Sequence, residues 1–104
     1  MLNKKELEKE IEKALVKSVK DRGGLCIKMN SLSMSGIPDR LILMKSSKIG
    51  FVELKRKGKK PRPLQLRRIK QLRELGVPCF VLDDKEQIGG ILDAICTTSL
   101  SRVC

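Results

Sequence analysis

The sequence predicts one α/β domain, a mixed β-sheet with helices packed on it in the order α-β-β-β-α-β-α. The length of 104 residues allows a single hydrophobic core, and 40% of the residues are apolar. These apolar residues recur at helical spacing in some stretches and form short compact runs in others. We expect residues 1–96 to form the domain and residues 97–104 to form a C-terminal tail.

The first half of the chain predicts a helix followed by three strands. A helix is expected over residues 4–22, where apolar side chains recur at every third or fourth position. Gly23-Gly24 ends this helix, and residues 25–29 have the composition of a short strand. Two further apolar runs, residues 39–44 and 50–55, are separated by a short polar turn. We therefore expect them to pair as an antiparallel hairpin.

The second half of the chain predicts a helix, a strand and a last helix. Pro63 suits the first turn of a helix, and Gly76 suits its C-terminal end. Residues 77–82 form a compact apolar run that is typical of a buried strand. Asp83, with Glu86 three positions later, resembles a capping box that begins a helix reaching residue 95.

Positive charge is concentrated in one part of the sequence. Lysine and arginine number 23 against 12 acids, which gives a net charge of +11. Ten of the basic residues lie between positions 55 and 73, a stretch without any acid, and this pattern favours a nucleic-acid partner. The alternatives are a protein whose positive charge only maintains its solubility and a protein that binds an anionic membrane. The expected DNA-binding residues are Lys57, Lys59, Lys60, Arg62, Arg67 and Arg68.

Several classes of site are excluded by composition. The chain contains no histidine, which excludes Ser-His-Asp and Cys-His catalysis. Its four cysteines are widely separated, so we expect reduced thiols rather than a zinc site, and any metal should bind oxygen. Phe51 and Phe80 are the only aromatic residues, too few for a platform that stacks single-stranded bases. No membrane-spanning apolar run or signal peptide is visible, so we expect an intracellular protein.

Two carboxylates and a lysine stand out at the predicted hairpin. Asp39 opens the first strand, and alternation places Glu53 and Lys55 on one face of the second. A hairpin brings the start of one strand beside the end of the other, so these three side chains should converge. Close carboxylates favour a cation between them, and Mg²⁺ prefers oxygen ligands. The alternative is a surface ion pair of Glu53 with Lys55, and an Asp39 that only caps a turn.

Three short stretches carry a resemblance to a known family. Residues 36–40 (GIPDR), 51–55 (FVELK) and 63–65 (PLQ) resemble, in order and spacing, the VRR-NUC (virus-type replication-repair nuclease) domain in the stand-alone form found in phages. This domain belongs to the PD-(D/E)XK superfamily, which includes the archaeal Holliday-junction resolvases. The first helix of those resolvases resembles residues 11–16 followed by Gly23.

The resemblance implies a metal-dependent active site with Mg²⁺ as the cofactor and Mn²⁺ as a substitute. Its metal ligands would be Asp39, Glu53 and the backbone carbonyl of Leu54, and Lys55 would be the catalytic lysine. Gln65 would be an auxiliary active-site residue. The alternative for Gln65 is an ordinary polar residue in the first turn of a helix.

The resemblance also implies an acid on the first helix. Glu12 matches that position and would contact the metal or its bound water. Glu8 and Glu10 lie nearby and are alternatives for this role. The early glutamates could also form nothing more than a solvated face of the helix.

Residues and resemblance together predict a metal-dependent DNA endonuclease that acts in phage replication, recombination or repair within a bacterial host. We expect selectivity for four-way junctions or other branched DNA, and a homodimer for which residues 77–82 and 88–95 are candidate surfaces. The alternative to the dimer is a monomeric nicking nuclease, or a domain that relies on a larger partner to present its substrate. The alternatives are a non-catalytic basic DNA-binding module and a nuclease that acts on RNA. Loss of metal binding in variants of Asp39 and Glu53 would separate the enzyme from the binding module.

Overall fold

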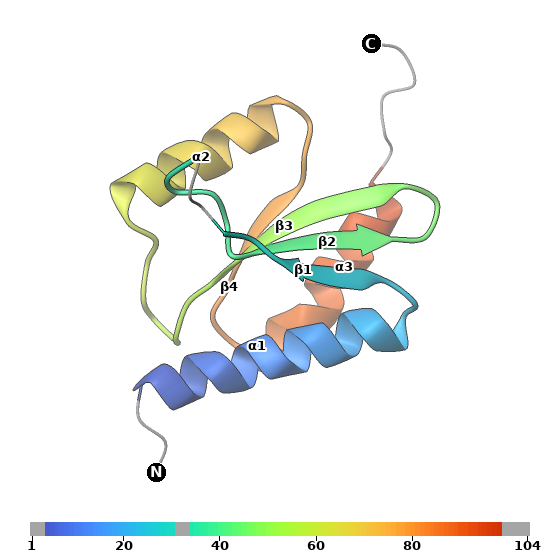
Figure 1. Cartoon of the computed structure of the whole chain (residues 1–104), viewed down its shortest axis with the longest axis horizontal. Helices are drawn as coiled ribbons and strands as arrows, with labels where there is room; N and C mark the ends of the chain where they lie inside the picture. The colour runs from blue at the N-terminus through green and yellow to red at the C-terminus, as the bar shows by residue number, and fades with distance from the viewer. Residues whose placement is uncertain (1–3, 31–33, 99–104) are drawn as a thin grey trace.

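The computed structural model describes residues 4–30 and 34–98. Its elements follow the predicted order, with one short 3-10 helix added before the last helix (Figure 1). The predicted α/β class is therefore confirmed. In chain order the elements are α1 (Lys4–Asp21), β1 (Leu25–Lys28), β2 (Arg40–Met44), β3 (Lys48–Leu54), α2 (Pro63–Glu74), β4 (Cys79–Leu82), η1 (Lys85–Gln87) and α3 (Ile88–Thr97).

The four strands form one mixed sheet in the order β1-β2-β3-β4. β1, β2 and β3 are consecutive antiparallel neighbours, which confirms the predicted hairpin of β2 with β3. β4 pairs with β3 in parallel after the crossover through α2. The hairpin register joins Arg40 to Val52. Asp39, the residue before β2, therefore comes level with Glu53 near the end of β3.

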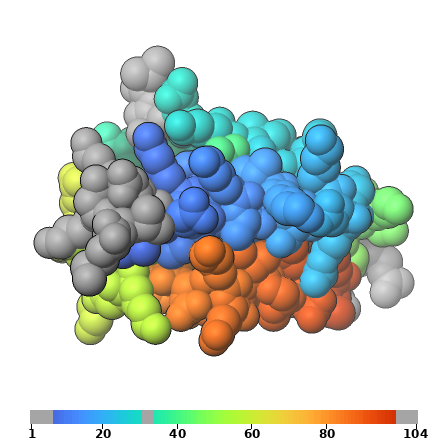
Figure 2. All heavy atoms as spheres, turned by 90° about the horizontal axis from the view of Figure 1, so that it is seen from below, coloured from blue at the N-terminus to red at the C-terminus, as the bar shows by residue number. Residues whose placement is uncertain are grey.

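One face of the sheet carries the hydrophobic core. α1 and α3 pack on this face, and Figure 2 shows them side by side along the surface of the molecule. The apolar side of each helix meets the inward side chains of β2, β3 and β4, so the hairpin is fixed against both helices. The buried residues of this core are Ile11, Leu15, Val19, Ile42, Met44, Val52, Leu54, Leu82, Ile88, Ile91, Leu92 and Ile95.

The other face of the sheet is only partly covered. α2 lies across the sheet from α1 (Figure 1) and packs over β4, where Ile69 and Cys79 are buried. The half of this face formed by β1, β2 and the start of β3 carries apolar side chains that are exposed or half-buried. We call it the open sheet face, and its residues are Leu25, Ile27, Leu41, Leu43, Ile49 and Phe51, aligned in two rows across the strands. Leu25, Ile27 and Ile49 are 62%, 39% and 40% exposed.

The ends of two elements differ from the sequence-based prediction. β4 begins at Cys79, directly after Pro78, rather than at residue 77. The cap before the last helix is Asp84, whose Oδ1 accepts a hydrogen bond from the Glu86 backbone N–H at 3.0 Å. The predicted cap, Asp83, instead accepts the Gly58 N–H at 3.2 Å. The prediction was wrong because η1 inserts a turn between β4 and α3.

The two surfaces predicted for pairing with a second copy both contribute side chains to the core of the domain, and pairing through them stays a prediction. Residues 88–95 contribute Ile88, Ile91, Leu92 and Ile95 to the core of the same chain. In residues 77–82, Cys79 and Leu82 are buried as well. The apolar side chains of α3 pack on the sheet, whereas β4 is an edge strand that pairs with β3 on one side. The open sheet face is a further apolar surface of the described residues that is partly exposed.

Other predictions concern the ends of helices. Gly76 has φ of 89° and follows the last turn of α2, as predicted. α3 extends to Thr97, and most of the predicted C-terminal tail lies outside the described residues. Within residues 4–30 and 34–98, no helix combines the length and apolar character that crossing a membrane requires.

Candidate active site

The structure brings Asp39, Glu53 and Lys55 together at one end of the β2–β3 hairpin. Oδ2 of Asp39 accepts a hydrogen bond from the backbone N–H of Leu54 at 2.8 Å. The Lys55 ammonium lies 3.2 Å from Oε2 of Glu53. The antiparallel register and the alternation of side chains along β3 produce this arrangement. The carboxylates of Asp39 and Glu53 and the ammonium of Lys55 thus lie together at the end of β3.

Glu53 is buried, with 1% of its surface exposed. Burial and the negative charge of Asp39 raise the pKa of the Glu53 carboxyl to about 7, although Lys55 lowers it. Its Oε1 atom has no hydrogen-bond partner within the described part of the chain. A buried, unpartnered carboxylate oxygen is costly for a purely structural residue. A cation bound at this oxygen would remove the cost.

Gln65 connects the start of α2 to Glu53. Its Nε2 donates a hydrogen bond to Oε2 of Glu53 at 2.7 Å. Its Oε1 accepts the backbone N–H of Arg62 at 2.8 Å, which satisfies a free donor at the helix N-terminus. Both the nitrogen and the oxygen of the Gln65 amide are therefore hydrogen-bonded. Gln65 holds the carboxylate of Glu53 through its Oε2, while Oε1 of Glu53 has no partner among the residues that the structure describes.

Glu12 does not join this group of side chains. Its Oε2 accepts hydrogen bonds from Nε and Nη2 of Arg40 at 3.1 and 2.9 Å. Within residues 4–30 and 34–98, no three Asp, Glu, His or Cys side chains gather closely enough to hold a metal. Of the alternatives on α1, Glu10 pairs with Lys85 and Glu8 is exposed. A direct contact of Glu12 with the metal or its water therefore stays a prediction.

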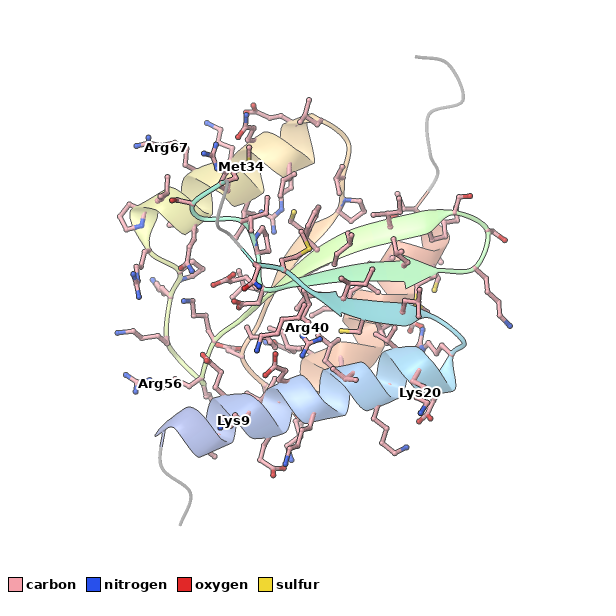
Figure 3. The ribbon with its side chains drawn as sticks, viewed as in Figure 1. Lys9, Lys20, Met34, Arg40, Arg56 and Arg67 are labelled. Atoms are coloured by element: carbon pink, nitrogen blue, oxygen red, sulfur yellow. The ribbon has the colours of Figure 1, made fainter. Side chains whose placement is uncertain are left out.

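Sequence reasoning missed Arg40. It follows Asp39 directly, and its side chain points toward α1 (Figure 3). Besides the ion pair with Glu12, its Nη1 donates to the carbonyl oxygen of Cys26 at 3.2 Å. The alternation of side chains along β2 places Arg40 on the same side as the core residues Ile42 and Met44. A charged residue at such a position indicates a buried partner, and this could have identified Arg40. Arg40 ties the start of β2 to both β1 and α1.

The donor set fits a hard divalent cation. Asp39 and Glu53 supply carboxylate oxygens, and the carbonyl oxygen of Leu54 belongs to the peptide unit beside them. Mg²⁺ is usually bound by one or two carboxylates and retains several waters, so a full cage of protein ligands is not required. The unpartnered Oε1 of Glu53 is the observation that supports such a cation at this position.

The basic residues lie beside this site, on the loop after β3 and along α2. Most of them are exposed: Lys57, Lys59, Lys60, Arg62 and Arg67. Lys57 approaches Asp84 at 3.4 Å but keeps most of its side chain in solvent. Arg68 differs from the others because it is half-buried and hydrogen-bonded to the carbonyl oxygen of Ser35 and to Gln71. The exposed cations can meet phosphates without any rearrangement of the core.

The fold and this cluster define the class of protein. A mixed sheet flanked by helices, whose hairpin presents an aspartate and a Glu-x-Lys sequence, is the core of the PD-(D/E)XK nucleases. Enzymes with this fold generally use divalent metals. No protein-family model matches the chain.

Comparison with known proteins shows the family. The chain is 43% identical over 88 residues to "Putative nuclease p44" of Acyrthosiphon pisum secondary endosymbiont phage 1, covering 85% of this chain and 94% of that protein. A solved structure described as a VRR_NUC domain superposes with a TM-score of 0.77 at 31% identity, covering 83% of this chain and 94% of the other. The chain belongs to the VRR-NUC family and is a nuclease.

Proposed function

We propose that this nuclease is a Mg²⁺-dependent DNA endonuclease. The observation that carries the proposal is the pair of carboxylates, Asp39 and Glu53, at the end of the hairpin. One buried oxygen of Glu53 has no hydrogen-bond partner in residues 4–30 and 34–98. An oxygen in this position supports a cation-dependent reaction. The exposed basic residues on the adjoining loop and helix support a polyanionic substrate.

Each residue of the site has a distinct part in hydrolysis. Asp39, Glu53 and the Leu54 carbonyl would hold Mg²⁺ or Mn²⁺, which supplies an activated water and stabilises charge on the phosphate. The reaction adds the water oxygen to phosphorus and breaks one phosphodiester P–O bond. Lys55, held at 3.2 Å from Glu53, would stabilise the negative charge that develops on the phosphate. Gln65 would keep Glu53 in place.

We further propose that the substrate is branched DNA, four-way junctions in particular, in phage replication, recombination or repair. Contacts from lysine and arginine to phosphates do not read sequence, so selectivity would come from DNA shape. A two-fold dimer would present two active sites, which matches the two cuts that resolve a symmetric junction. The open sheet face supports such a dimer because it is apolar, whereas the chain as a whole carries +11.

Isosteric replacement of the carboxylates tests the catalytic proposal. Asp39→Asn and Glu53→Gln remove a charged metal ligand and leave the size of the side chain unchanged. We expect each to lower the cleavage rate at least about a hundredfold, since even outer residues of metal sites contribute 10- to 100-fold. DNA binding and cooperative unfolding should persist. Asp93→Asn, which removes an exposed carboxylate paired with Arg22, is the matched control.

The assay uses plain duplex, flap, splayed and four-way DNA, each with Mg²⁺, Mn²⁺ or EDTA. Cleavage by the natural chain should require the metal and be fastest on the four-way junction. Full activity of either carboxylate variant would contradict the site assignment. Equal rates on the junction and on plain duplex would contradict the substrate preference and leave the nuclease assignment intact.

A further inference from the structure

Helix α2 contacts the segment that leads to Asp39 as well as the side chain of Glu53. Gln65, in its first turn, holds Glu53 by a hydrogen bond of 2.7 Å. One turn later, Nε of Arg68 donates to the carbonyl oxygen of Ser35 at 2.9 Å. Ser35 lies shortly before Asp39 in the chain. One helix therefore touches both carboxylate-bearing parts of the site.

Gly36 shows how closely this segment sits on α2. A Cβ atom at Gly36 would lie 3.0 Å from Cγ of Arg68 and 3.0 Å from both Cγ and the carbonyl oxygen of Leu64. Gly36 also has φ of 81°, a conformation that other residues rarely adopt. The loop thus rests directly on the helix at a point where a side chain has no room. Pro38, which follows, is fully buried and keeps Asp39 beside this contact.

The guanidinium of Arg68 is held by hydrogen bonds at the surface of α2. Besides the bond to Ser35, its Nη1 donates to Oε1 of Gln71 at 2.9 Å, and the residue is half-buried. Arg67, the preceding residue, is exposed and points away from the domain (Figure 3). The two adjacent arginines have the same charge, but Arg68 is half-buried and hydrogen-bonded to Ser35 and Gln71, whereas Arg67 is exposed.

We propose that Arg68 is a positioning residue of the active site rather than a phosphate ligand. This inference rests on the proposed function. The inward side of α2 fixes Glu53 through Gln65 and the segment before Asp39 through Arg68, so it sets the relative placement of the two carboxylates. The outward side, with Arg67, binds DNA. A small displacement of one carboxylate relative to the other reduces the rate strongly, because metal and phosphate must be held in a defined geometry.

Arg68→Lys tests the proposal, because it keeps the positive charge and removes the two-point hydrogen bonding to Ser35 and Gln71. We expect kcat to fall about ten- to a hundredfold, with DNA affinity and its salt dependence unchanged. Arg67→Ala is the matched comparison, and its effect should appear in Kd, KM and the salt dependence. Affinity for Mn²⁺ without DNA, measured by titration calorimetry, should fall in Arg68→Lys and stay unchanged in Arg67→Ala.

Gly36→Ala provides a second perturbation of the same contact without any change of charge. It should also lower kcat and Mn²⁺ affinity while leaving the salt dependence of DNA binding unaltered. Retained kcat and Mn²⁺ affinity in both Arg68→Lys and Gly36→Ala would overturn the inference, as would weaker DNA binding by Arg68→Lys with kcat retained. Absence of Mn²⁺ binding and cleavage in the natural chain would instead overturn the proposed function.

Discussion

Glu53 is a charged residue in a position where proteins seldom tolerate one. It lies in β3 between the buried residues Val52 and Leu54, and its carboxyl is almost entirely removed from water. Transfer of a carboxylate from water into such surroundings costs several kcal/mol unless it is compensated. Lys55 and Gln65 compensate one oxygen only. A residue kept at such a cost in stability is typical of a functional site.

The raised pKa of Glu53 predicts how pH changes the stability of the metal-free protein. An unfolded chain releases this proton near the usual pKa of 4.5, whereas the folded chain keeps it until about pH 7. Stability from Glu53 is therefore complete below pH 4.5 and declines as pH rises toward 7. The loss is at most about 3 kcal/mol. Urea unfolding in EDTA from pH 5 to pH 8 measures it.

Glu53→Gln is the control for this measurement, since it cannot titrate. It should be more stable than the natural chain at pH 8, and the difference should shrink toward pH 5. Mg²⁺ should stabilise the natural chain more at pH 8 than at pH 5, because metal and proton compete for the same carboxylate. A constant difference between the two proteins across this pH range would contradict the shifted pKa.

At the scale of elements, the loop after β3 and the start of α2 form the predicted phosphate-binding surface. Replacing three exposed cations together should weaken binding to all DNA sequences alike, since each neutralised phosphate releases counterions. The slope of log Kd against log salt should decrease by up to about 0.9 for each phosphate that the variant no longer neutralises. The variant is Lys59→Ala with Lys60→Ala and Arg62→Ala. The Arg62 backbone N–H that binds Gln65 is retained.

A triple variant on the exposed side of α1 removes the same charge at a distance from this surface. It combines Lys13→Ala, Lys17→Ala and Lys20→Ala, which are all exposed. We expect a much smaller change in affinity and in the salt slope. An equal effect of both triple variants would show that overall charge, and not the loop and α2, governs binding.

The sequence was sufficient to predict elements whose formation depends on local patterns. Helix periodicity, the Gly76 end of α2 and the β2–β3 hairpin all depend on residues close together in the chain. The proximity of Asp39, Glu53 and Lys55 was predictable for the same reason. Asp83 and Asp84 could not be distinguished as caps, because an extra turn of 3-10 helix has no clear signal in a short polar stretch.

Contacts between distant side chains were not predictable. The pairing of Arg40 with Glu12 depends on how α1 crosses the sheet. The assignment of Arg68 to DNA came from its charge, whereas its hydrogen bonds to Ser35 and Gln71 depend on the seating of a loop on α2. In both cases the residue type was visible, but its surroundings are set by tertiary packing.

At the scale of the whole molecule, the open sheet face is the basis for a predicted homodimer. Single lysine substitutions at its exposed positions should place charge in the interface and produce monomers. The variants are Leu25→Lys and Ile49→Lys. Leu75→Lys is the matched control, because Leu75 is 73% exposed at the end of α2 and lies outside this face.

Light scattering in line with size exclusion measures the mass of each protein. We expect two chains for the natural protein and for Leu75→Lys, and one chain for the other two variants. These monomers should nick a four-way junction without cutting both strands together. A mass of one chain for the natural protein across the micromolar range would exclude the dimer.

The residues assigned to the reaction on β2, β3 and α2 come from one uninterrupted stretch of chain. Residues 39–65 contain Asp39, Glu53, Lys55 and Gln65. They are therefore inherited as one block whenever this stretch is exchanged between related genes. The block meets α1 and α3 through apolar side chains of β2 and β3 and through the ion pair of Arg40 with Glu12. Cores tolerate exchanges that conserve apolar volume. Exchange of this stretch between related chains would therefore transfer all four residues together, while α1 and α3 would come from the recipient chain.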